Sequence, residues 1–187
     1  MKYFLALLFC LTLFVSCKKD SKDVSIFCLY EKIIADYEKE NFEKEGNPVI
    51  NYVLVDASFN PGMLSSVLSV NNKIITKSDI DTLQRQIGDR EFDIVDKRCI
   101  TSKIILTSNK LNGWYKLGYE GFWKEFESVY GKSGYYRFSK PLFTKDRKRL
   151  IVLFENTYFK MTPIGTFYIY VRKNDQWVLE NNSVTYF

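Results

Sequence analysis

The chain contains no histidine among its 187 residues, and this absence restricts the chemistry that its side chains can perform. It excludes Ser-His-Asp and Cys-His nucleophilic catalysis, since both need an imidazole base. It also excludes zinc and copper sites with histidine ligands. Carboxylate, lysine, tyrosine and serine chemistry remain. No catalytic or cofactor-binding motif stands out, so the sequence predicts no catalytic residue and no cofactor.

Paired carboxylates would be the remaining route to a hydrolase such as a glycosidase. That chemistry needs two carboxyl groups about 5 to 9 Å apart across a groove. The candidates, by residue type alone, are Glu120, Glu125, Glu127 and Glu155. Glutamates on helix surfaces are usually solvated, so a carboxylate-dependent hydrolase is the alternative hypothesis and not the main one.

Acidic residues also gather within one short region: Asp79, Asp81, Asp89, Asp93 and Asp96. Calcium is the cation that such oxygen ligands would suit, but their spacing does not fit an EF-hand loop. Helix caps and turns explain these residues better, and no metal site is predicted.

Aromatic residues are abundant, with 13 Tyr, 15 Phe and 3 Trp. A subset in the second half of the chain could offer stacking surface to a sugar or a peptide: Trp114, Tyr115, Tyr119, Tyr135 and Tyr136. The alternative is that these rings pack in the core, because buried aromatic rings outnumber ligand platforms.

The first residues, MKYFLALLFCLTLFVSC, have the pattern of a secretory leader. Lys2 supplies a positive charge, residues 3–15 are uncharged and mostly apolar, and the small residue Ser16 precedes Cys17. The apolar run is shorter than the roughly 20 residues that a membrane-spanning helix needs. We therefore expect a signal peptide over residues 1–16, a polar tether over 17–23 and one domain over 24–187.

Phe14-Val15-Ser16-Cys17 resembles the lipobox of bacterial lipoproteins, with Phe14 where leucine is usual. With the Lys/Asp/Ser tether behind it, the segment is similar to lipoproteins of Bacteroidota-type bacteria. The resemblance implies that Cys17 carries palmitate-type acyl chains. These would anchor the protein in a membrane of the cell envelope, on its periplasmic face or at the cell surface. The alternatives are a secreted protein in which Cys17 is incidental, or a leader that forms a buried core helix.

Two further cysteines, Cys28 and Cys99, belong to the predicted domain. An oxidising compartment would allow them to form a disulfide. Two buried free thiols, packing as small apolar side chains, are the other interpretation, and the sequence leaves both open. The formal net charge of +5 is mild and the basic residues are scattered, so nucleic acid is not a predicted partner.

Hydrophobic periodicity predicts helices over residues 25–43, 78–87 and 121–130, and strands over 49–56 and 103–107. Residues 109–118 are predicted as a loop. Short strands and polar turns follow, over 135–143, 150–159, 166–172 and 176–180, and residues 183–187 could add an edge. The expected fold is α+β, with a C-terminal antiparallel β-meander packed by about three helices.

The last third of the chain resembles a group of uncharacterised lipoproteins. The residues concerned are Phe122, Trp123, Phe126, Tyr130, Gly134, the run 138–143, Asp146, Gly165, Tyr168 and the run 173–177. This resemblance implies a layout of strands, and no particular activity follows from it. A weaker architectural likeness is to folds of the cystatin or nuclear-transport-factor type.

The main functional prediction is a non-enzymatic binding or accessory module of the cell envelope, with an unknown protein or glycan partner. The alternatives are the carboxylate-dependent hydrolase and an inhibitor or immunity protein that caps another protein. A large exposed apolar patch would favour the last of these.

Overall fold

The computed structural model describes residues 24–42, 50–56, 64, 71, 73–87, 99–158 and 164–186. The predicted leader, Cys17 and the tether lie outside these residues. In the described part of the chain, no helix combines the length and the apolar character that crossing a membrane requires.

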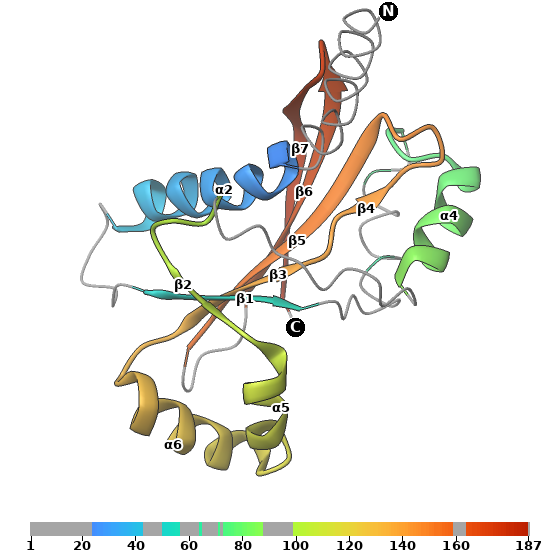
Figure 1. Ribbon diagram of the computed structural model, residues 1–187. Helices are drawn as coiled ribbons and strands as arrows, with labels where there is room; N and C mark the ends of the chain where they lie inside the picture. The colour runs from blue at the N-terminus through green and yellow to red at the C-terminus, as the bar shows by residue number, and fades with distance from the viewer. Residues whose placement is uncertain are drawn as a thin grey trace, which may run out of the picture.

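The described residues form an α+β fold, as predicted, with four helices beside one sheet (Figure 1). The helices are α2 (Val24–Phe42), α4 (Lys77–Ile87), α5 (Ser108–Tyr115) and α6 (Gly118–Tyr130). The strands are β1 (Tyr52–Asp56), β2 (Ile104–Leu106), β3 (Tyr135–Ser139), β4 (Leu142–Phe143), β5 (Arg149–Thr157), β6 (Ile164–Lys173) and β7 (Gln176–Tyr186).

The sheet has the strand order β2-β1-β3-β5-β6-β7, and β4 pairs with β5. The C-terminal strands are antiparallel, which confirms the predicted C-terminal sheet. β1 is parallel to both β2 and β3, so the sheet as a whole is mixed. This position explains why β1 is apolar on both faces: Val53 and Leu54 point to opposite faces and both are fully buried.

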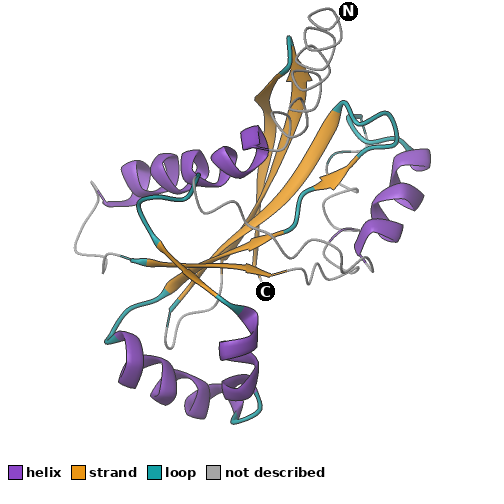
Figure 2. Ribbon diagram, in the orientation of Figure 1, coloured by secondary structure: helices purple, strands orange, loops and turns teal. Residues whose placement is uncertain are grey.

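Alternate residues of β5 belong to two different cores, one on each face of the sheet. Leu150, Val152 and Phe154 pack in the core that includes α2. Ile151 and Leu153 pack in a second core together with Leu83 of α4. The period of two along a strand produces this division, and Figure 2 shows helices flanking the twisted sheet.

Helix α2 covers its face of the sheet with the apolar stripe that the sequence predicts. Ile26, Leu29, Tyr30, Ile33 and Ile34 are buried there. The Tyr30 ring stacks on Phe138 at 4.6 Å between ring centroids. Its hydroxyl group donates a hydrogen bond to the backbone oxygen of Ser139, 3.1 Å away.

The predicted loop over residues 109–118 is wrong, because its first part is helix α5. Asn109, Asn112 and Gly113 are poor helix formers, so the local sequence pattern favours a loop over a helix here. Its stability comes from packing: Leu111 is fully buried, and Trp114 packs against the same core. Helix α6 starts three residues earlier than predicted, at Gly118.

Strands β6 and β7 form a hairpin at the predicted turn. Lys173 pairs with Gln176, so Asn174 and Asp175 make a two-residue loop. Both have positive φ, 49° and 60°, as in the hairpin turns that match the twist of paired strands. β7 is one strand where the sequence suggests two segments, and a register shift lies between Ile169 and Tyr170 of its partner β6.

Candidate functional site

A cavity of about 620 Å³ lies between the α5–α6 pair and the sheet. We call it the α5–α6 cavity. Its volume is in the range usual for small-molecule sites. Its lining has two parts, an aromatic wall from the helices and a polar floor from β3 and β5.

The wall is built by the end of α5 and the first turns of α6. Tyr115 stacks on Phe122 with 4.6 Å between ring centroids and 8° between ring planes. Tyr119 contacts Trp123 edge to face at 6.5 Å. Phe122 and Trp123 are buried, whereas Tyr115 and Tyr119 are 43% and 54% exposed. The cavity therefore has a fixed aromatic base and an accessible aromatic rim.

The floor follows from the register of β3 against β5. Tyr135 pairs with Thr157, and Arg137 pairs with Glu155. Residues two apart on a strand share a face, so all four side chains point toward α5 and α6, and all four line the cavity. Asn112 adds an amide from α5.

Arg137 and Glu155 form an ion pair in this floor. Arg137 Nη1 lies 3.1 Å from Glu155 Oε2, and the side chains are 30% and 5% exposed. A buried carboxylate requires such a partner, because an unpaired charge in the interior is costly. The pair presents a cation and an anion side by side at the bottom of the cavity.

The Tyr115 and Tyr135 hydroxyl groups lie 3.0 Å apart and share a hydrogen bond. Burial raises the pKa of Tyr135 well above its ordinary value, and the adjacent Tyr115 hydroxyl raises it further. The Tyr135 hydroxyl therefore stays protonated at physiological pH and acts as a neutral donor and acceptor, not as a base.

Three of the predicted stacking residues, Tyr115, Tyr119 and Tyr135, line the α5–α6 cavity. Trp114 does not: its ring packs in the core against Phe122 and Tyr130, at 6.4 and 6.1 Å between centroids. For this residue the core-packing alternative is correct.

Tyr136 is also outside the cavity, because it alternates with Tyr135 along β3 and points to the opposite face. Its hydroxyl group donates to Glu38 Oε1 of α2 at 2.9 Å, and Lys103 Nζ approaches the same oxygen at 2.7 Å. Burial and the Glu38 carboxylate raise the pKa of Tyr136. This network joins α2 to the sheet.

The structure brings one of the four candidate carboxylates, Glu155, to the cavity. Glu120 and Glu127 line a separate depression at the surface of α6, with Lys124 between them in sequence. Since both project from one helix about 10 Å apart along its axis, they do not face each other across a groove. The described lining of the α5–α6 cavity therefore holds a single carboxylate.

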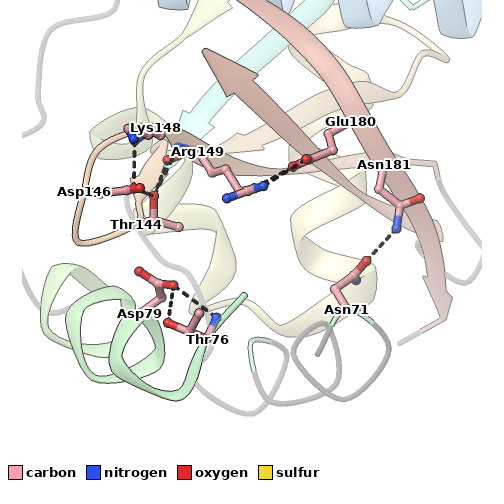
Figure 3. A network of polar contacts seen from close by, with 9 residues as sticks. All are labelled: Asn71, Thr76, Asp79, Thr144, Asp146, Lys148, Arg149, Glu180 and Asn181. Atoms are coloured by element: carbon pink, nitrogen blue, oxygen red, sulfur yellow. Dashed lines mark hydrogen bonds and ion pairs between the residues drawn. The ribbon is translucent and has the colours of Figure 1, made fainter. Parts of the chain in front are cut away.

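Of the clustered aspartates, Asp79 has structural partners for its carboxylate. Asp79 Oδ2 accepts hydrogen bonds from the Thr76 hydroxyl and the Thr76 backbone N–H, at 2.6 and 3.0 Å (Figure 3). Asp79 Oδ1 accepts the backbone N–H of Lys145 at 3.0 Å. Asp81 lies on the exposed side of α4, and Asp89, Asp93 and Asp96 lie outside the described residues.

The hydrogen bond between Asp79 and Lys145 ties α4 to the β4–β5 turn, and Figure 3 shows the polar contacts within α4 and within the turn on either side of it. In the turn, Asp146 Oδ1 accepts from the Thr144 hydroxyl at 2.8 Å and from the Lys148 backbone N–H at 3.0 Å. Arg149 then pairs with Glu180 of β7 at 2.6 Å. In the part of the chain that the structure describes, no group of three or more acidic or cysteine residues is placed to hold a metal ion.

Cys28 and Cys99 form a disulfide, with their Cα atoms 4.7 Å apart. The sequence left open whether these cysteines form a disulfide or are two free thiols, and in the structure they form the disulfide. The bond connects the N-terminal half of α2 to the segment before β2, and Cys99 packs in the same core as α2.

Sequence reasoning missed Arg137, Asn112, Thr157, Phe122 and Trp123 as cavity residues, and it considered Glu155 only as a hydrolase candidate. One signal was present: Tyr135 and Arg137 share a face in any strand. The pairing of Arg137 with Glu155 depends on the antiparallel register, which the sequence does not state.

Comparisons with protein families, curated proteins and solved structures find no match to this chain.

Proposed function

We propose that this protein is a lipid-anchored binding protein of the bacterial cell envelope that holds a small ligand in the α5–α6 cavity. The observation that carries the proposal is the composition of that cavity, with accessible Tyr115 and Tyr119 at its rim and the Arg137–Glu155 pair in its floor. Aromatic surface with a few convergent polar groups is the usual make-up of a ligand site.

Binding suits these residues better than catalysis. Glu155 is engaged by Arg137, and the raised pKa of Tyr135 keeps its hydroxyl protonated. The chain has no histidine to act as a base. The groups of the floor can therefore orient a ligand through hydrogen bonds, and we assign no catalytic role to any of them.

The envelope location rests on the leader and is supported by the disulfide. Residues 1–16 have the features of a lipoprotein leader, and Cys17 follows it directly. Structural disulfides persist in oxidising compartments such as the periplasm and the cell surface, and the Cys28–Cys99 bond fits such a place.

Ligand capture is tested by native mass spectrometry of the full chain, expressed with its leader in a Bacteroidota host and purified from the envelope. We expect an adduct of defined mass on the wild type. The Tyr115→Ala/Tyr119→Ala variant, which changes two exposed side chains, should lose that adduct. Leu117→Ala is the matched control: Leu117 is 56% exposed, lies between them in sequence and does not line the cavity. Wild type without an adduct, or an adduct kept by the double variant, would contradict capture in this cavity.

Lipidation is tested separately by metabolic labelling with a palmitate analogue. The parent chain should take up the label, and Cys17→Ala should not, because the thiol at that position would carry the acyl group. Label retained by Cys17→Ala would refute an anchor at that residue.

A further inference from the structure

The charged lining and most of the aromatic lining of the α5–α6 cavity come from different layers of the fold. The accessible aromatic side chains project from α5 and α6, and the charged side chains project from β3 and β5. A ligand in this space meets aromatic surface on one side and hydrogen-bonding groups on the other. Such a ligand needs one apolar face and one strongly polar edge.

The floor carries both signs of charge in contact. Arg137 Nη1 and Glu155 Oε2 are 3.1 Å apart, so their charges offset each other. An anionic ligand that approached Arg137 would also meet the buried Glu155 carboxylate, and a cationic ligand would meet Arg137. A neutral ligand that carries polar groups avoids both repulsions and can still hydrogen-bond to either member of the pair.

Hydroxyl groups on a ligand would suit the cavity floor, because each hydroxyl group can both donate and accept a hydrogen bond. A pair of neighbouring hydroxyls can donate to Glu155 and accept from Arg137 at the same time. Thr157 and the protonated Tyr135 hydroxyl add two more groups of the same dual capacity beside them. A purely apolar ligand, such as an acyl chain, would displace water from these groups without offering them hydrogen bonds in its place.

From this arrangement we infer that the ligand is a neutral carbohydrate. One pyranose ring would place its C–H face on the aromatic rim, at Tyr119 and Tyr115, and its hydroxyl edge on the Arg137–Glu155 pair. Flat aromatic side chains with a polar tip suit a ligand of this amphipathic kind. The inference rests on the proposed function, since it names the chemical class of the ligand for the same cavity.

Isothermal titration calorimetry of the full chain tests the ligand class with three kinds of probe. The neutral probes are maltotriose, cellotriose and N,N′,N″-triacetylchitotriose. The anionic sugar probe is trigalacturonate, and the acyl-chain probe is palmitate, an anion with a long apolar tail. We expect one neutral trisaccharide to bind. Tyr119→Ala should weaken that binding about tenfold through the loss of its aromatic surface, while the control Leu117→Ala leaves it unchanged.

A second variant separates sugar from apolar ligands. Thr157→Val keeps the shape of the side chain and removes its hydroxyl group, so it should weaken the binding of the neutral sugar several-fold. An apolar ligand would instead bind at least as tightly to Thr157→Val as to the wild type. Thermal unfolding of each variant shows that the fold is intact.

The carbohydrate inference is overturned if no neutral trisaccharide binds, if only trigalacturonate or palmitate binds, or if binding survives Tyr119→Ala unchanged. In each of these cases the adduct experiment decides the broader proposal independently. A cavity-dependent adduct that is not a sugar leaves the binding function standing and removes this inference alone, whereas the absence of any adduct removes both.

Discussion

The hydroxyl groups of Tyr115 and Tyr135 are 3.0 Å apart and connect the last residue of α5 to the first residue of β3. Tyr135 is 3% exposed, whereas Tyr115 is 43% exposed. The contact therefore gives a buried phenol a partner that is itself in reach of water. It fixes one corner of the α5–α6 cavity.

Replacing Tyr135 by Phe should lower the free energy of unfolding by about 1 kcal/mol, because it removes one hydrogen bond in a buried position without opening a cavity. Tyr115→Phe leaves the Tyr135 hydroxyl in a buried place without this partner, and we expect a loss of similar size. Urea unfolding of both single variants and of the double variant gives the coupling between the two groups. Fully additive effects would show that the hydroxyls do not interact.

Gly134→Ala should destabilise the protein by about 2 to 4 kcal/mol, because a Cβ at this position meets backbone instead of open space. It would collide with the backbone oxygen of Thr157 and would lie 2.7 Å from Cδ1 of the Tyr158 ring. β3 and β5 would have to separate beside the cavity floor.

Gly113→Ala is the matched control for that change. A Cβ added there meets nothing within 4 Å, and the residue lies inside α5, where alanine is the better helix former. We expect a gain of up to about 1 kcal/mol. Thermal or urea unfolding measures both variants, and a destabilised Gly113→Ala would contradict the assignment of α5.

Asp79→Asn should lower the free energy of unfolding by about 1 to 2 kcal/mol at neutral pH, because the carboxylate accepts three hydrogen bonds. Burial opposes ionisation of Asp79, but the hydrogen bonds from Thr76 and Lys145 outweigh it and lower the pKa below its ordinary value. A carboxyl group with a lowered folded-state pKa stabilises the fold fully above its unfolded pKa of about 3.9.

The stabilisation from Asp79 is then lost as the pH falls through the folded-state pKa. The difference between wild type and Asp79→Asn should accordingly be constant above about pH 5 and shrink below about pH 4. Urea unfolding at a series of pH values measures it. Asp81→Asn, a change on the exposed side of the same helix, should give a difference near zero; an equal loss in both variants would argue against a specific role for Asp79.

Removal of the disulfide in Cys28→Ala/Cys99→Ala should cost about 4 kcal/mol of unfolding free energy in the chain-entropy model, since the bond closes a loop with a sequence separation of 71. Guanidinium unfolding with and without a reducing agent provides the measurement. The wild type should become less stable on reduction and the double variant should not change. If the unfolding free energy of the wild type were the same with and without the reducing agent, the disulfide would be absent or would not stabilise the fold.

The sequence by itself determined the features that depend on local pattern. The apolar stripe of α2, the place of a tight turn at residues 173–175 and the α+β class follow from periodicity and turn chemistry, which act over a few residues. The absence of histidine restricted the chemistry before any fold was known. The leader over residues 1–16, with Cys17 directly after it, is likewise a local pattern, and its role stays a prediction.

Tertiary structure decided everything that depends on which strands are neighbours. It placed β1 parallel to β2 and β3, stabilised α5 through the burial of Leu111 despite weak helix formers, and directed Tyr135 and Tyr136 to opposite faces. It also brought Arg137 to Glu155 across a register that joins residues 18 positions apart. The sequence states which side chains are present. Contact between distant residues is set by packing and strand register, and the α5–α6 cavity depends on that contact.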